Sequence, residues 1–580
     1  MDAIFGNGKI SKREYEIVYE QDVAITMSDG VKISVDIFRP DGKGRFPALL
    51  GISTFNKEIQ ADRIWPAPTR SKRIRGIPNA CLETANTDFF VRRGYVNIIG
   101  AVRGTGKSGG VYQYLSPREV QDTYEIIEWI AKQPWCNGNV GMVGLGYYSA
   151  HQPLVAQLQP PHLKALAPIG TFWDNYRHFW WSGGVLQRGF LRWLVSLVNF
   201  DAHHEKSALK EELGEKGYRE AIARALADRD ISAAPDIVEA LKNYEQVGNV
   251  NYLDIVLQPL MSKYWIDRGS ELDFEKIRVP AYFGATGHRP SVLYYWNDFV
   301  MPRKMVFFPK IYLDRPFYQF TWELLRWFDY WLKGIDTGIM DEPSIKIFVE
   351  GTDEWLMTDD FPVAGTKWIP FNLHENQSLC EIEPWPDADA LSYDDAPGNR
   401  GHLKYYSAPM VENMEVIGPV VLNVYASCRG SEMLLGASLW DVDREGKETK
   451  LSQCWLRGSH RELDTKKSRP WLPVHTHTNP QPLVPGQVYE FNIGIWPIAQ
   501  LFKAGHRMML KISSSDDAPE TIYQVGSEHL ISQTPNTITI YHNARYPSHL
   551  LVPITRGNII GTYVSGGDIS LKSKEFMKLE

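Results

Sequence analysis

The stretch "NVGMVGLGYYSAHQP", residues 139–153, decides the fold. It begins with an apolar run that predicts a buried strand, passes through two closely spaced glycines and continues as a helix. This order is typical of a nucleophile elbow, in which a strained G-x-S-x-G turn holds a serine hydroxyl above a parallel sheet. The central position here is Gly146, so we predict an elbow without its nucleophile.

Glycine suits this turn because it adopts positive φ without a Cβ penalty. Taken alone, however, the run is equally compatible with an ordinary strand–glycine–helix connection. Ser149 is the nearest hydroxyl, but one helical turn past the elbow we expect it to bond locally to the backbone. For His151, on the same helix, we expect a surface or core role rather than catalysis.

Strands and helices alternate on both sides of this motif. Near-continuous apolar strands alternating with amphipathic helices indicate a parallel sheet covered on both faces. The predicted strands are 47–53, 95–102, 140–145, 163–170, 279–286 and 304–309, and the predicted helices are 117–133, 147–157 and 320–334. A helical and aromatic stretch interrupts the alternation, and we interpret it as an inserted cap.

The pattern changes after about residue 343, where short β-like runs are separated by Gly, Pro, Asn and Asp. This pattern is typical of an all-β sandwich, and we expect a jelly roll. We therefore predict an α/β domain formed by residues 1–170 and 271–340, a helical cap at 171–270, and a jelly-roll domain at 341–580.

The composition limits the partners of the protein. A net charge of −7 over 580 residues gives no basic face for nucleic acid, and no stretch of the sequence resembles a membrane-spanning helix. The five cysteines are scattered, and the first residues lack the apolar core of a signal peptide. We expect a cytoplasmic protein that acts on a small molecule and has no nucleic-acid or membrane partners. A homo-oligomer is possible.

Two motifs suggest a cofactor but do not support one. "AVRGTGKSGG" (101–110) resembles a phosphate-binding loop, yet that pattern needs glycine where the chain has Ala101. The histidine pairs His203–His204 and His475-x-His477 lack further residues with metal-ligand spacing. We expect no nucleotide, no metal and no other cofactor.

The whole chain resembles the family of cocaine esterase and X-prolyl dipeptidyl aminopeptidase-like hydrolases, which includes acylases and α-amino-acid ester hydrolases. The resemblance is carried by "MSDGVKISVDIFRPDGKGRFPALL", "EVQDTYEIIEWIAKQPWCNGNVGMVGLGYYS", "FDYWLKGIDTG" and "PLVPGQVYEFNIGIWPIAQLFKAGHRMMLKISSSD". It implies an α/β-hydrolase domain with an inserted helical cap and a C-terminal jelly roll, in agreement with the pattern of the elements.

Position by position, the resemblance implies that the catalytic machinery is degenerate. The family's serine corresponds to Gly146, and its oxyanion-binding tyrosine corresponds to Phe55 in "GISTFNKE". Only the backbone N–H of Tyr147 then remains as an oxyanion donor.

The other two triad positions also differ from the family. His288 or Arg289 stands where the family's aspartate is expected, and Pro309 or Tyr312 where its histidine is expected. Because a catalytic triad acts as a unit, these differences predict that serine hydrolysis is lost.

Replacement chemistry is expected from "TFWDNYRHFWW" (171–181), which enters the cap directly after a strand. It combines acid–base groups with aromatic rings, as a π-rich pocket would, although the rings could equally pack on the sheet. Our candidate catalytic residues are Asp174, His178, His288 and Tyr312. Our candidate substrate-binding residues are Phe55, Gly146, Tyr147, Trp173, Tyr176, Trp180, Trp181 and Arg289.

Three functions remain compatible with these observations. The main hypothesis is a non-hydrolytic enzyme that cyclises, isomerises or eliminates a small hydrophobic molecule, in specialised-metabolite biosynthesis, without a serine nucleophile. The second is a catalytically dead protein that binds a ligand. The third is a residual ester or amide hydrolase in which a new base, such as Asp174 or His178, activates water.

Overall fold

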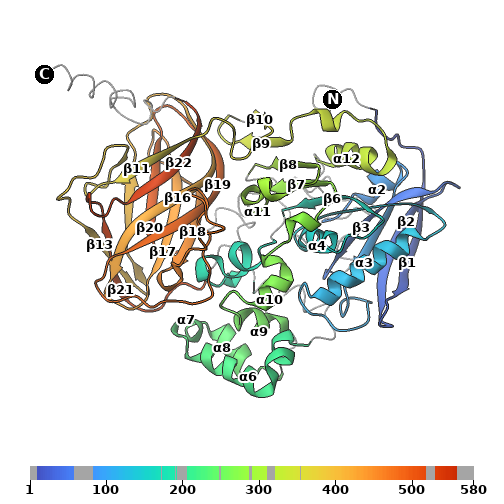
Figure 1. The fold of residues 1–580 in the computed structure, drawn as a ribbon, viewed down its shortest axis with the longest axis horizontal. Helices are drawn as coiled ribbons and strands as arrows, with labels where there is room; N and C mark the ends of the chain where they lie inside the picture. The colour runs from blue at the N-terminus through green and yellow to red at the C-terminus, as the bar shows by residue number, and fades with distance from the viewer. Residues whose placement is uncertain are drawn as a thin grey trace.

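Two β-layered halves lie side by side in the computed structural model (Figure 1). The structure describes residues 9–55, 57, 83–170, 173–189, 191, 206–246, 250–285, 291–309, 320–352, 354–516 and 529–557. The first half is an α/β domain and the second an antiparallel sandwich, so both fold classes expected from the sequence are confirmed.

The α/β half is built on a ten-stranded sheet. Strands β3 to β9 pair in parallel. At one edge β2 pairs antiparallel with both β1 and β4, and at the other edge β10 pairs antiparallel with β9. In spatial order the strands are β1 (Ile17–Thr26), β2 (Lys32–Pro40), β4 (Val96–Ala101), β3 (Phe46–Ser53), β5 (Cys136–Leu145), β6 (Leu163–Ile169), β7 (Ala281–Ala285), β8 (Arg303–Phe307), β9 (Ile345–Val349) and β10 (Glu354–Thr358).

Helices pack against this sheet. The predicted ones are α3 (Pro117–Ala131), α4 (Tyr147–Ala156) and α12 (Thr321–Lys333), whereas the shorter α2 (Thr87–Val91) and α11 (Ser291–Tyr294) were not predicted. The start of α3 is fixed locally, because the Ser116 side chain accepts a bond from the Glu119 N–H and proline occupies the first helical position. Gly334, at φ 68°, ends α12 in a left-handed cap.

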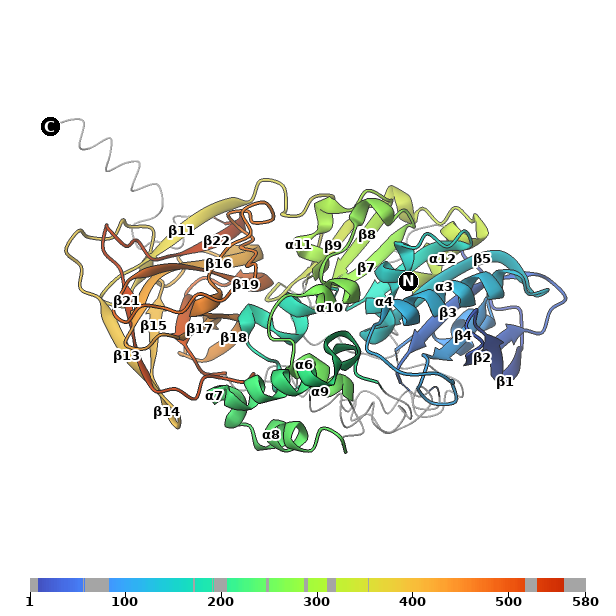
Figure 2. The ribbon, with the colours of Figure 1, turned by 60° about the horizontal axis from the view of Figure 1, so that its bottom comes forward.

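A group of helices fills the stretch that we assigned to a cap. They are α6 (Ala208–Ala227), α7 (Arg229–Ser232), α8 (Pro235–Lys242), α9 (Val250–Val256) and α10 (Lys263–Trp265). A π-helical turn, η3 (Tyr176–Trp180), and a short 3₁₀ turn, η4 (Ser182–Gly184), come before them in the chain. Figure 2 shows the green cap helices beneath the junction of the two halves.

Two antiparallel sheets form the second half. One contains β11 (Lys367–Leu373), β12 (Leu379–Cys380), β13 (Leu391–Ala396), β14 (Asn399–Arg400), β16 (Met414–Cys428), β19 (Tyr489–Phe502), β21 (Asn536–Tyr541) and β22 (His549–Arg556). The other contains β15 (His402–Tyr406), β17 (Leu434–Val442), β18 (Glu448–Arg457) and β20 (Arg507–Ser513). Fully buried side chains from both sheets, such as Leu422, Leu435 and Leu510, form their shared core.

One pair of strands extends the first sheet instead of the sandwich. β9 pairs in parallel with β8, and β10 pairs with β9, although both strands lie within the stretch that the sequence interpretation placed in the jelly roll. The alternating pattern of a short strand does not specify which sheet it joins. Backbone bonds between Glu350, Ala499 and Leu501 then connect the end of β9 to β19 of the sandwich.

The described residues contain no helix long and apolar enough to cross a membrane. The four cysteines among them, Cys136, Cys380, Cys428 and Cys454, are free thiols, whereas Cys81 lies outside the described residues.

Candidate active site

The elbow predicted from the sequence is present at the end of β5. Gly146 has φ 61° and ψ −119°, a conformation that a residue with a side chain adopts only under strain. Its N–H donates to the Ile169 carbonyl at 3.3 Å, and its own carbonyl accepts from the Ala150 N–H at 2.9 Å within α4. The strand–turn–helix geometry of a nucleophile elbow is therefore kept by a residue that has no hydroxyl.

Ser149 does not replace the missing hydroxyl. It is fully buried, and its Oγ donates to the Gly146 carbonyl at 2.8 Å. This is the local backbone bond expected for a hydroxyl in the first turn of a helix.

The buried carboxylate of Glu119 holds Tyr147, the first residue of α4, in place. The Tyr147 hydroxyl lies 2.8 and 3.0 Å from the two Glu119 carboxylate oxygens, and it accepts a bond from the Leu115 N–H at 3.1 Å. Glu119 also lies 3.1 Å from Nε2 of His151, whose core position agrees with the sequence interpretation. Burial raises the pKa of Tyr147 well above its ordinary value, so its hydroxyl stays protonated.

Part of the expected site lies outside the described residues. In parallel sheets, sites form at the carboxyl ends of the strands. The segments 58–82, 171–172, 286–290 and 310–319 follow β3, β6, β7 and β8 in the chain and are not described. The candidate residues His288, Arg289 and Tyr312 fall within these segments, so the loss of the whole triad stays a prediction.

The aromatic residues at the start of the cap are mainly packing residues. Trp173 packs edge-on against Phe283 and Phe299, and Trp180 packs against Tyr114, with ring centroids 5.6 to 5.8 Å apart. These contacts follow the alternative we considered, in which the rings pack on the sheet and within the cap.

Three further candidates are buried in similar ways. The Tyr176 hydroxyl donates to the Pro259 carbonyl at 2.7 Å, and the Trp181 indole donates to the Ile255 carbonyl at 3.0 Å. Phe55 follows β3 and is 7% exposed. Phe55 and Gly146 are not among the described residues that line the cavity considered next.

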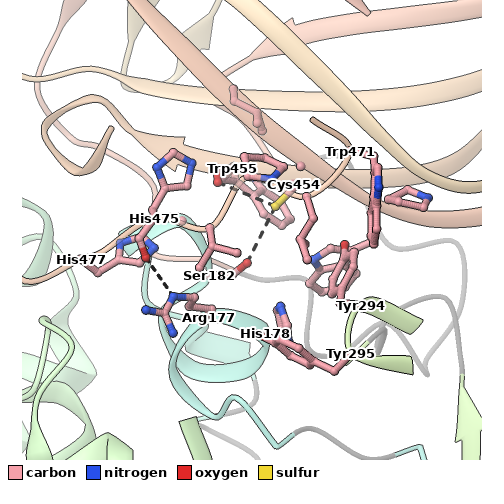
Figure 3. A pocket seen from close by; sticks show the side chains of 18 residues that line it. Arg177, His178, Ser182, Tyr294, Tyr295, Cys454, Trp455, Trp471, His475 and His477 are labelled. Atoms are coloured by element: carbon pink, nitrogen blue, oxygen red, sulfur yellow. Dashed lines mark hydrogen bonds between the residues drawn. The ribbon is translucent and has the colours of Figure 1, made fainter. Parts of the chain in front are cut away.

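A cavity lies where the cap meets the sandwich (Figure 3). The cavity is small, with a volume of about 60 Å³, and it is partly open to solvent. From the start of the cap it is lined by Arg177, His178 and Ser182, and from α11 and the residue after it by Tyr294 and Tyr295. The sandwich contributes Cys454, Trp455, Trp471, His475, His477 and Trp496.

His178 is the candidate base that lines this cavity. Its Nδ1 lies 3.1 Å from the Ser291 hydroxyl, and no described residue is bonded to its other ring nitrogen. Burial lowers the pKa of His178, and the nearby Asp174 charge only partly opposes this effect. The imidazole is therefore neutral near pH 7 and able to accept a proton.

Asp174 is held in a structural role. It is 1% exposed, accepts from the Arg177 backbone N–H at 3.0 Å, and lies 3.3 Å from both the Arg177 guanidinium and the Tyr295 hydroxyl. These partners engage the carboxylate, whereas one ring nitrogen of His178 is bonded to no described residue.

The cavity also holds a thiol and a hydroxyl, Cys454 and Ser182, with Sγ and Oγ 3.9 Å apart. Burial raises the pKa of Cys454 to about 11, so the thiol is not ionised at neutral pH and is a poor nucleophile. Among the described residues, no group of three or more His, Cys, Asp and Glu side chains could hold a metal ion.

Most of the cavity could not be found from the sequence. Tyr294 and Tyr295 carry no motif, and Trp471, His475 and His477 lie almost 300 residues after the start of the cap. The only signal was the His475-x-His477 pair, which we weighed as a metal site and not as a cavity wall.

Each half of the chain is similar to a domain that is known from other proteins. A family model described as X-Pro dipeptidyl-peptidase (S15 family) matches residues 29–287, and one described as the X-Pro dipeptidyl-peptidase C-terminal non-catalytic domain matches residues 337–551. The chain is therefore similar, in both of its halves, to X-Pro dipeptidyl-peptidase S15 family hydrolases. The two matches follow each other along the chain as the α/β half and the sandwich do.

Individual known proteins are similar to this chain over nearly its full length. Cocaine esterase of a Rhodococcus species is 25% identical over 92% of this chain and 98% of its own. The structure of a CocE/NonD family hydrolase from Staphylococcus aureus has a TM-score of 0.76 at 22% identity, covering 93% of this chain and 94% of its own. An α-amino acid ester hydrolase has a TM-score of 0.69 at 17% identity, covering 95% of this chain and 99% of its own.

These comparisons contradict our main functional hypothesis. The S15 family model and the curated relatives are named for peptidases and esterases, so the expected cyclisation, isomerisation or elimination is not supported. The physical reason for the error is that a missing serine removes acyl-enzyme chemistry but not hydrolysis, because water can attack the carbonyl directly. The findings favour the third hypothesis, a hydrolase-family enzyme.

Proposed function

We propose that the protein hydrolyses an ester or amide bond of a small molecule, with His178 as the base that activates water. The observation that carries this proposal is the state of His178: a neutral imidazole, oriented through Nδ1 by Ser291, that lines the cavity with a ring nitrogen bonded to no described residue. The nearly full-length likeness to cocaine esterase supports the reaction class. The substrate and the cytoplasmic location remain predictions.

The reaction needs no covalent intermediate. The imidazole removes a proton from water as the water oxygen attacks the carbonyl carbon. The developing oxyanion accepts a hydrogen bond from the Tyr294 hydroxyl, which lines the same cavity and which burial keeps protonated by raising its pKa well above 10.0. The imidazolium then returns its proton to the leaving alkoxide or amine, so that one water is consumed and an acid and an alcohol or amine are released.

The elbow explains why water replaces a serine in this scheme. At φ 61° and ψ −119°, Gly146 keeps the turn but supplies no hydroxyl. We therefore infer that the serine step of the family is absent here, with the degenerate positions at Phe55, His288, Arg289 and Tyr312 supporting the same interpretation.

The test compares three variants on 4-nitrophenyl esters and anilides. We expect H178Q to lower kcat/KM by about 10²- to 10⁴-fold, the contribution of a general base. H475Q is the matched control: His475 lines the same cavity, its Nε2 is bonded to the Asn492 carbonyl at 2.8 Å, and its Nδ1, which no described residue bonds, is buried. A loss in D174N with H178Q unchanged would assign the base to Asp174.

A fluorophosphonate probe separates the two mechanisms. We expect no covalent labelling at any concentration that labels a serine esterase, and no loss of turnover after treatment. Stoichiometric labelling together with inactivation would show that a serine nucleophile operates, and the proposed function would then be wrong in its mechanism.

A further inference from the structure

The charges around the cavity are one-sided. Arg177 is the one fully charged side chain among the described residues that line it, and no aspartate or glutamate is among them. The other polar groups, which include the hydroxyls of Ser182, Tyr294 and Tyr295, can all donate hydrogen bonds. A cavity of this composition favours an anion over a cation.

Arg177 is fixed in place by both neighbouring parts of the molecule. Its Nε donates to the His475 carbonyl of the sandwich at 2.9 Å, a bond drawn in Figure 3, and its Nη1 lies 3.3 Å from an Asp174 carboxylate oxygen. No described residue is bonded to Nη2. The guanidinium therefore has an ordered position and retains donors that a ligand could use.

The negative charge that balances Arg177 is set back from the cavity. Asp174 is 1% exposed, is not among the lining residues, and is engaged by the Arg177 backbone N–H and the Tyr295 hydroxyl. A ligand in the cavity therefore meets the cation and the donors, but not the carboxylate. Aromatic walls from Tyr294, Trp455 and Trp471 would cover the apolar part of such a ligand.

We propose, on the basis of the proposed function, that the substrate carries a carboxylate that Arg177 binds, next to the ester or amide carbonyl that His178 addresses. Because both residues line the same cavity, one bound molecule can reach both. The same arrangement disfavours substrates with a free amine, since none of the described lining residues carries a carboxylate that could pair with an ammonium group.

The experiment uses three esters with one leaving group and different charges. They are mono(4-nitrophenyl) glutarate, 4-nitrophenyl butyrate and 4-nitrophenyl 4-aminobutyrate. For the wild-type protein we expect kcat/KM to be about tenfold or more higher for the glutarate than for the neutral ester, the usual effect of a charge-assisted hydrogen bond, and lowest for the amine. R177Q should abolish the preference, and R177K should retain part of it because lysine keeps the charge without the planar fork.

Two further variants control for folding and for general electrostatics. R177Q/D174N removes both charges of the buried pair, so a lost preference in a folded double variant does not arise from an unpaired Asp174. R469Q removes a cation that lies 5.8 Å from the Trp471 ring and 3.4 Å from Asp298 but does not line the cavity. It should keep the full preference for the glutarate.

The outcomes separate this inference from the proposed function. Equal kcat/KM for the three esters, or a preference unchanged in R177Q, would overturn the carboxylate anchor while leaving hydrolysis in place. If none of the esters is hydrolysed, the proposed function fails, and calorimetric binding of 4-phenylbutyrate against 4-phenylbutyramide decides the anion site alone. Tighter binding of the acid that is lost in R177Q would support it, and equal binding would overturn it.

Discussion

The Nδ1 atoms of His460 and His477 lie 2.9 Å apart, buried where the sandwich meets the cap. One of the two nitrogens must donate and the other accept, so this contact requires that at least the accepting ring is neutral. His475 lies beside them, with its ring centroid 5.7 Å from that of His477. Burial lowers the pKa of all three histidines, that of His460 to about 3 and that of His477 well below 6.5.

The first prediction is that acid weakens the junction of the two halves. Below pH 6.5 the unfolded chain binds protons at these histidines that the folded chain does not, so the free energy of unfolding falls as pH decreases. For His460, whose pKa in the folded protein is about 3, this amounts to about 1.4 kcal/mol per pH unit, or about 2 kcal/mol by pH 5. Urea unfolding at several pH values should show this slope, and H460N should reduce it, whereas H162N, at a half-exposed histidine, should not.

The second prediction concerns the pH profile of hydrolysis. Catalysis needs neutral His178, whose pKa burial lowers, so kcat/KM should stay constant around neutrality and fall only through a midpoint below 6.5. S291A, which removes the Nδ1 partner, should reduce kcat by about tenfold, and S291T should restore part of it. An acid limb centred above 6.5 would exclude His178 as the base.

The third prediction concerns Gly183, which fits tightly against the sandwich. A Cβ at this residue would lie 1.8 Å from the Trp455 carbonyl oxygen, and φ there is +60°. Because the clash is with backbone, G183A should cost more than about 3 kcal/mol and open the junction. Limited proteolysis between the halves would detect the opening. The control is G214A, at φ +67° and ψ 172° with nothing within 4 Å, which should cost about 1–3 kcal/mol of backbone strain and cause no clash.

The fourth prediction concerns the carboxylate below the elbow. E119A removes the acceptor of the Tyr147 hydroxyl and the neighbour of His151, and should destabilise the protein by about 2–4 kcal/mol. Y147F should cost about 1–3 kcal/mol, because it leaves the buried Leu115 N–H without its acceptor and the Glu119 carboxylate without one donor. E128A, which breaks the more exposed pair between Glu128 and His162 at 2.8 Å, should cost less than about 1 kcal/mol by thermal unfolding. Equal effects of E119A and E128A would contradict a special stabilising role of the buried Glu119 carboxylate.

Local sequence patterns predicted the α/β half well, because its strands and helices are encoded by periodicity and caps within each segment. The elbow glycine was predicted for the same reason, since Gly146 lies between an apolar strand and a helix. The sheet that β9 and β10 join was not predictable, because strand pairing depends on contacts distant in the chain.

The site was harder to predict, because residue type alone does not show whether an aromatic side chain packs in the core or lines the cavity. Trp173 packs between Phe283 and Phe299, whereas Trp471 lines the cavity, and nothing in their local sequence separates the two roles. The contact of Ser182 with Cys454 joins residues 272 positions apart, so it depends on how the sandwich docks. Of the residues proposed from sequence, His178 is the one that the cavity favours as a base.

Residues 177–183 at the start of the cap and residues 454–496 of the sandwich both line the cavity. Under the proposed function, the reaction chamber therefore forms only after the sandwich has been synthesised and has docked against the cap. For the same reason, the protein cannot be trimmed to a minimal hydrolase domain without losing the half of the chamber that the sandwich supplies.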